Sequence, residues 1–177
     1  MRILCRLLVM ALFLCIGPTA FAAEEQGPNW EISMQPKPTA EEIENARWSF
    51  ILQNDFGVYA YDNKSLKFDV KKDLVSVLVK TVFTNEDVLK KLNQTYADKL
   101  NNNDKAAFCE MLMLFNPQEK SYAVKKMDVY SKQGMKLETK ENKLKMIPVP
   151  EKTFAEAMLE IAVAFVADEK AKDTNQN

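Results

Sequence analysis

The chain has 177 residues, with 24 basic side chains, 25 acidic side chains and no histidine. The lack of histidine excludes Ser-His-Asp and Cys-His catalysis and also zinc or haem sites that use imidazole ligands. The 4 glycines are too few and too scattered for a phosphate-binding loop, and the nearly balanced charge does not favour nucleic acid as a partner.

Residues 1–22 have the pattern of a secretory signal peptide. A basic start precedes the apolar run Leu7–Ile16, and Ala20–Ala22 forms an A-x-A site with cleavage before Ala23. An uncleaved anchor and a lipoprotein signal at Cys15 are the alternatives. The apolar run is shorter than the ~20 residues that span a bilayer, and the bulky Leu14 before Cys15 does not suit a lipid-attachment site. We therefore expect an exported protein, in the periplasm or at the cell surface, with no transmembrane segment in the mature chain.

The mature chain keeps 22 basic against 25 acidic residues, a formal charge of −3. Arg47 is its only arginine, so a site that grips phosphate or carboxylate in bidentate fashion is not favoured. Cys109 is its only cysteine, which excludes an internal disulfide and predicts a buried thiol. The length suits one domain.

Residues 23–46 form a polar, proline-containing arm. Thr39 and Glu42 are placed to cap a short helix that ends at Ala46. Trp30 is the one large apolar residue of the arm, and it either packs on the domain or contacts a partner. The domain itself is expected over residues 47–168.

The first half of the domain reads as strands followed by a helix. Residues 48–52 and 58–61 flank the turn sequence Asn54–Gly57, and a short strand is expected at residues 66–68. Residues 74–83 alternate and are half apolar on the second face, which predicts a strand partly covered on both sides. Helical spacing follows over residues 84–104, expected as a helix that crosses over the sheet.

The second half adds strands at residues 107–115, 121–130 and 135–139, with Cys109 on an apolar face. An amphipathic helix is expected over residues 153–167 and a disordered tail over residues 169–177. The chain therefore predicts an α+β domain: an antiparallel sheet of five to six strands, one crossover helix, and a C-terminal helix packed on the sheet.

This order of elements resembles the surface-adhesin protein E group of secreted bacterial domains. The similarity is carried by Trp48, by the run Val58–Asp62 with the turn to Leu66, by the strand pair from Ser121 to Gly134, and by Ile147–Pro150 before the last helix. It extends over residues 48–166 and implies a mainly antiparallel sheet with a helix at the C-terminus.

The chain departs from that group at two points. The group ties its sheet to the final helix with a disulfide, whereas the final helix here contains no cysteine beside Ile161–Ala164. The basic, arginine-bearing segment associated with host-matrix binding also has no counterpart. The resemblance therefore implies a fold rather than particular binding residues.

One strand pair stands out as a candidate partner-binding surface. Residues 119–145 hold eight lysines against four acidic residues, with tyrosines interleaved. The candidate contact residues are Tyr122, Lys125, Lys126, Tyr130, Lys132 and Lys136. An anionic protein or glycan is the partner that this pattern suits. The alternative is that these lysines shield a sheet edge from aggregation.

Catalysis is not indicated. Cys109 has apolar neighbours and no histidine to activate it, and Glu110 fits a lysine-paired carboxylate better than an acid–base catalyst. We expect no cofactor and no metal site. The function predicted from sequence is a non-catalytic, adhesin-like interaction module. The alternative is a periplasmic carrier with a small apolar ligand in a sheet–helix cavity lined by Met111, Met113, Phe115 and Met158.

Overall fold

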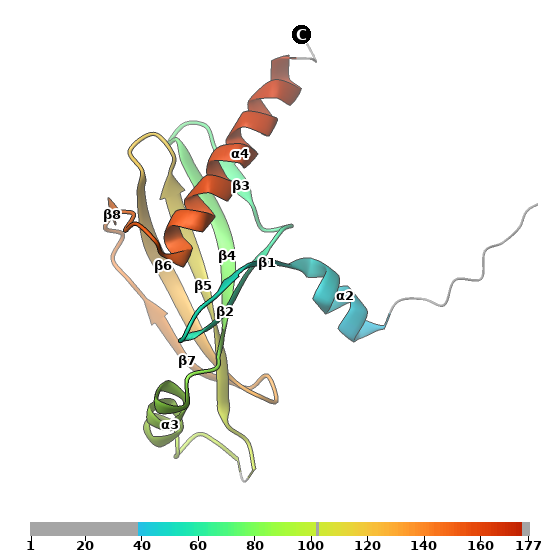
Figure 1. Cartoon of the computed structure of the whole chain (residues 1–177), viewed down its shortest axis with the longest axis vertical. Helices are drawn as coiled ribbons and strands as arrows, with labels where there is room; N and C mark the ends of the chain where they lie inside the picture. The colour runs from blue at the N-terminus through green and yellow to red at the C-terminus, as the bar shows by residue number, and fades with distance from the viewer. Residues whose placement is uncertain (1–38, 102, 175–177) are drawn as a thin grey trace, which may run out of the picture. The chain divides into compact units, whose positions relative to one another are not determined.

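The computed structural model describes residues 39–101 and 103–174 and arranges them as an α+β domain (Figure 1). The elements are α2 (Ala40–Arg47), β1 (Trp48–Gln53), β2 (Gly57–Asp62), β3 (Lys67–Asp69), β4 (Leu74–Phe83), α3 (Glu86–Thr95), β5 (Ala106–Asn116), β6 (Ser121–Ser131), β7 (Lys136–Glu141), β8 (Ile147–Pro148) and α4 (Phe154–Thr174). The expected signal peptide, the arm up to residue 38 and residues 175–177 of the expected tail lie outside the described residues.

All eight strands belong to one antiparallel sheet, in which the order β1-β2-β4-β5-β6-β7 follows the chain. Strand β3 pairs with β4 beyond the end of β2, and β8 pairs with β6 beyond the end of β7. Strands β2 and β3 therefore lie one after the other along the same edge of β4, and β7 and β8 lie one after the other along the same edge of β6. The predicted fold class, an antiparallel sheet with a C-terminal helix, is confirmed.

The β1–β2 hairpin forms where its turn chemistry predicts it. The side-chain oxygen of Asn54 accepts a hydrogen bond from the N–H of Phe56 at 2.9 Å, as expected for an Asx turn. A Cβ atom at Gly57 would lie 2.2 Å from the carbonyl oxygen of Val82. Only glycine therefore lets β2 approach β4 this closely at the first residue of the strand.

Helix α4 covers one face of the sheet, here called the covered face (Figure 1). Its buried side chains interleave with the alternating residues of β4 and β5, and the ring of Phe154 stacks on Tyr59 at 4.6 Å. The buried residues of this core are Val75, Val77, Val79, Met113, Phe115, Met158, Leu159, Ala162 and Val166. Burial of this stripe is what holds the helix on the sheet.

The start of α4 is fixed by a capping box. The hydroxyl of Thr153 accepts the N–H of Glu156 at 3.4 Å, and the carboxylate of Glu156 accepts the N–H of Lys152 at 2.6 Å. The helix continues to Thr174, so the prediction of disorder from residue 169 is wrong for residues 169–174. This last stretch lacks an apolar stripe, but residues 169–172 are good helix formers and hold a Glu169–Lys172 ion pair at 2.8 Å.

Helix α3 covers the other end of the same face. Asn85 caps it by accepting the N–H of Val88 at 3.1 Å, and Tyr96, just past its end, packs with Cys109, Val129 and Leu137 in a second core cluster. Because α3 joins neighbouring antiparallel strands, it packs on one end of the sheet and does not cross it. It ends at Thr95, well before the predicted end at residue 104.

Two details of the strands differ from the expectation. Strand β4 is covered on one face only: Val75, Val77 and Val79 are buried, whereas the residues between them are partly exposed. A register shift near the start of β5 buries Ala106 in place of Ala107. Such a bulge changes which residues face the core without leaving a clear mark on the alternating pattern.

Candidate functional site

The face of the sheet opposite α4, here called the open face, carries no helix over its centre in the described part of the chain. Directly paired residues of an antiparallel sheet lie on the same face, so the register gives its rows. Across β4, β5 and β6 these rows are Val82–Phe108–Tyr130, Lys80–Glu110–Asp128, Leu78–Leu112–Lys126 and Ser76–Leu114–Ala123. The open face therefore passes from an aromatic row through a charged row to leucine-rich rows.

A groove runs along the leucine-rich rows, and we call it the leucine groove. It consists of two adjoining hollows of about 520 and 470 Å³ that share Lys67, Ser76, Leu114 and Lys125. The first hollow is lined further by Leu78 and Leu112, the second by Leu74 and Leu144. Leu144 is 56% exposed. The floor is thus apolar surface that the domain leaves in contact with water.

Lysines form both rims of the leucine groove. Lys67 on β3 is paired directly with Ser76, and Lys64 precedes it in the turn after β2. On the other side, the register shift between Leu112 and Met113 leaves Lys125 without a partner on β5, and its side chain lines both hollows. A bulge that redirects one side chain is a common device at binding sites.

Three lysines of the two rims have no counter-ion among the residues that the structure describes. Lys126 pairs with Asp128 at 3.1 Å and Lys72 pairs with Asp69 at 3.4 Å. By contrast, Lys64, Lys67 and Lys125 make no ion pair within the described residues. The rim therefore offers positive charge that an anionic group could neutralise.

The charged row closes one end of the groove. Burial raises the pKa of Glu110 above the usual carboxyl value, while the cations Lys80 and Arg47 act in the opposite direction. Burial also acts to raise the pKa of Asp128, but hydrogen bonds from Thr139, Lys126 and Lys136 lower it overall. Glu110 thus lies near the cations Lys80 and Arg47 but also near the carboxylates Glu44 and Asp128, and it makes no ion pair within the described residues.

Aromatic side chains stack beyond this row. The rings of Phe108 and Tyr130 lie 4.9 Å apart, and the ammonium group of Lys80 lies 4.6 Å from the centre of the Phe108 ring and 4.9 Å from that of Trp48. Lys136 approaches Tyr130 at 5.6 Å. These cation–π contacts hold Lys80 and Lys136 close to the sheet.

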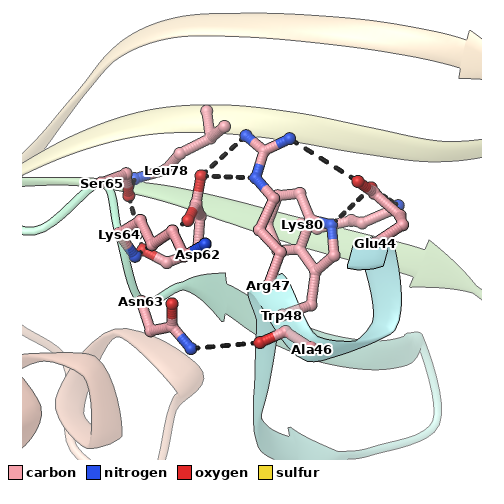
Figure 2. Close-up of polar contacts among 10 residues, drawn as sticks. All are labelled: Glu44, Ala46, Arg47, Trp48, Asp62, Asn63, Lys64, Ser65, Leu78 and Lys80. Carbon is pink, nitrogen blue, oxygen red and sulfur yellow. Dashed lines mark hydrogen bonds and ion pairs between the residues drawn. The ribbon is translucent and has the colours of Figure 1, made fainter. Parts of the chain in front are cut away.

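Helix α2 is fastened beside the open face by Arg47 (Figure 2). Its Nε and Nη2 atoms both lie 2.7 Å from Oδ2 of Asp62, a carboxylate with 5% of its surface exposed. Glu44 accepts a hydrogen bond from the indole N–H of Trp48 at 2.6 Å and pairs with Lys80 at 3.5 Å. The helical part of the expected arm is therefore joined to the domain, which extends to the N-terminal side of the predicted boundary at residue 47.

The predicted contact residues do not form one patch. Lys125 and Lys126 line the leucine groove. Tyr130 and Lys136 lie outside it, with the aromatic side chains beyond the charged row. Tyr122 packs instead on the covered face, with its ring 6.0 Å from that of Phe115. Lys132 lies near α3, beside Val82 and Leu89. The expectation of an exposed surface shared by all six residues is wrong for Tyr122 and Lys132.

Sequence reasoning missed the other rim and the floor of the groove. Lys64 and Lys67 lie far from Lys125 in sequence, and only strand pairing brings them to the same groove. The sequence does contain a pattern for the floor of the groove. On β4 and β5, leucines alternate with core residues, at Leu74, Leu78, Leu112 and Leu114. An apolar second face of this kind predicts a strand covered on both sides, whereas here it forms the floor of the groove.

Cys109, which the sequence analysis considered as a nucleophile, lies in the second core cluster. Cys109 is buried and free, and burial raises the pKa of its thiol to about 11. Among residues 39–101 and 103–174, no cluster of three metal-ligating side chains is present. The side chains expected to line a carrier cavity lie in or against the packed core, and Met113, Phe115 and Met158 have no exposed surface.

An antiparallel sheet with one face covered by a C-terminal helix and the other face open defines the class of fold. The structure of protein E from Haemophilus influenzae, in its selenomethionine form, is similar to this chain with a TM-score of 0.50 and 14% identity, over 67% of this chain and 87% of that one. A second crystal form of protein E gives a TM-score of 0.46 at 14% identity, over 60% and 80% of the two chains. The resemblance expected from the sequence is thus confirmed for the fold.

No protein-family model matches the chain, and no curated protein matches it either. Within the described residues, none of the helices is long and apolar enough to cross a membrane.

Proposed function

We propose that this protein is a non-catalytic, adhesin-like interaction module, exported to the periplasm or surface of a bacterial cell, that holds an anionic partner on its leucine groove. The observation that carries the proposal is a set of lysines on both rims of an exposed apolar floor, Lys64, Lys67 and Lys125, which make no ion pair within the described part of the chain. Unpaired charge attracts a partner from a distance, and apolar surface supplies contact energy once the partner has arrived.

The test is a charge reversal on the two rims. The double variant Lys67→Glu/Lys125→Glu should lose the partners that the mature wild-type protein captures from envelope and host-matrix extracts. Capture by wild type should weaken as salt rises, because the screening length is only ~10 Å at 0.1 M. The matched control is Lys90→Glu/Lys91→Glu on the exposed side of α3, which changes the charge equally but lies away from the groove.

Equal loss of capture in both double variants would mean that bulk charge, not the groove, attracts the partner. Unchanged capture by the groove variant would remove the leucine groove from the proposal. Circular dichroism of each variant establishes that it is folded, since exposed charges contribute little to stability.

Export is tested separately. The proposal expects the protein isolated from its native cells to begin at Ala23, as read by intact mass. A chain that retains residues 1–22 would contradict cleavage, and recovery from the cytoplasmic fraction would contradict export.

A further inference from the structure

We propose that the occupant of the leucine groove is an extended peptide segment of the pattern apolar-x-acidic-x-apolar, with its acidic side chain between Lys67 and Lys125. This inference rests on the proposed function and names the class of partner. It is carried by the order of side chains along the groove, which runs from apolar to basic to apolar.

The strand register sets this order. Leu78 and Leu112 form one row, Ser76 and Leu114 form the next, and Leu74 lies two residues further along β4. Lys67 is the direct neighbour of Ser76, and Lys125 lines the same part of the groove from β6. Lys126 in the first row pairs with Asp128, and Asp69 beside Leu74 pairs with Lys72. Within the described residues, positive charge without a counter-ion is therefore centred on the middle row, with leucine surface before and after it.

The spacing of these rows matches that of an extended peptide. Successive side chains on one face of a strand are two residues apart, about 6.6 Å along the strand. A peptide that lies along β4 repeats this distance with its own alternate side chains. The first apolar residue of the peptide then lies over Leu78 and Leu112. The acidic residue, two positions later, lies beside Lys67, Lys125 and the Ser76 hydroxyl. The second apolar residue, two positions further, lies over Leu74.

The shape of the groove favours a peptide over an acyl chain. Small apolar ligands bind in sites that bury most of their surface, whereas the floor here is a layer of leucine side chains with solvent above it. A peptide retains hydrated backbone groups on its outer side and needs apolar contact only below. The lysine pair supplies the charge complementarity that a carboxylate requires.

The experiment is an NMR titration of the folded mature protein with synthetic peptides. The probe has the core Leu-Ser-Glu-Ser-Leu. A second peptide, Leu-Glu-Ser-Ser-Leu, has the same composition but moves the acid by one position, and a third replaces glutamate by lysine. We expect amide shifts at Ser76, Leu78 and Leu112 with the probe, and binding about three- to tenfold weaker for the displaced acid and for Lys67→Gln/Lys125→Gln. The control Lys90→Gln/Lys91→Gln should bind the probe as wild type does.

Equal binding of the probe and the displaced-acid peptide would overturn the proposed register, as would equal binding of the lysine peptide. Binding to phosphatidylglycerol vesicles without binding to the probe would assign the groove to a lipid surface and overturn the peptide. If extracts are captured through Lys67 and Lys125 but the probe does not bind, the peptide class fails while the proposed function stands. If the extracts are not captured through Lys67 and Lys125 and the probe does not bind, both proposals fail.

Discussion

Replacing Met158 by alanine tests whether α4 is part of the cooperative fold. The side chain has no exposed surface and lies in the core cluster with Val77, Met113 and Phe115. Alanine removes three heavy atoms beyond Cβ, and about 0.8 kcal/mol per methylene-sized group gives a loss of about 2.4 kcal/mol from transfer alone. The cavity left beneath the helix adds to this, so we expect a total near 3 to 4 kcal/mol.

The assay is urea unfolding followed by circular dichroism, with a matched control on the same helix. Val163 is 47% exposed, and Val163→Ala should change the unfolding free energy by no more than about 0.5 kcal/mol. Met158→Ala should lower the urea midpoint without changing the slope of the transition. If both variants unfold at the same urea concentration, α4 is an appendage and the reasoning from burial is refuted.

Further predictions concern the α2 anchor and the buried thiol. Arg47→Ala should lower the unfolding free energy by about 1 to 3 kcal/mol, because Asp62 then keeps a buried charge without its partner; the double variant with Asp62→Asn should recover part of this, and no recovery would contradict the pairing. Cys109 should react slowly with a thiol reagent at neutral pH until the protein is unfolded. Because burial raises the pKa of Cys109 from 9.0 to about 11, its contribution is complete below about pH 9 and is lost as pH rises toward 11, by about 2 to 3 kcal/mol in total. Urea titrations of wild type and Cys109→Ala should differ in slope against pH within that window, and parallel curves would contradict a buried thiol.

The strands could be predicted because their patterns are local. Residues 74–83 carry valines at alternate positions, and the structure forms β4 over the same range. The residues around Asn54 and Gly57 carry their own turn chemistry. Local patterns of this kind depend only on backbone periodicity and turn geometry. They suffice to recover the fold class, although not the end of α3 or of α4.

The groove could not be predicted because it depends on pairing. A strict alternation would send Lys125 and Lys126 to opposite faces, whereas the bulge in β6 brings both to one groove. Lys67 reaches the same groove only because β3 pairs with β4. Helix α2 is likewise placed by long-range contacts, which pair Arg47 with Asp62 and Glu44 with Lys80. Register shifts and long-range ion pairs leave no periodic signal in a single sequence.

The order of the strands across the sheet has a consequence for the time course of folding. Each strand on the main path pairs with the next strand of that path, so the sheet can grow one hairpin at a time. The covered face, however, is completed only by α4, the most C-terminal of the described elements. Val77 and Phe115 thus stay exposed to water until α4 has docked, so the hairpins alone do not complete the core.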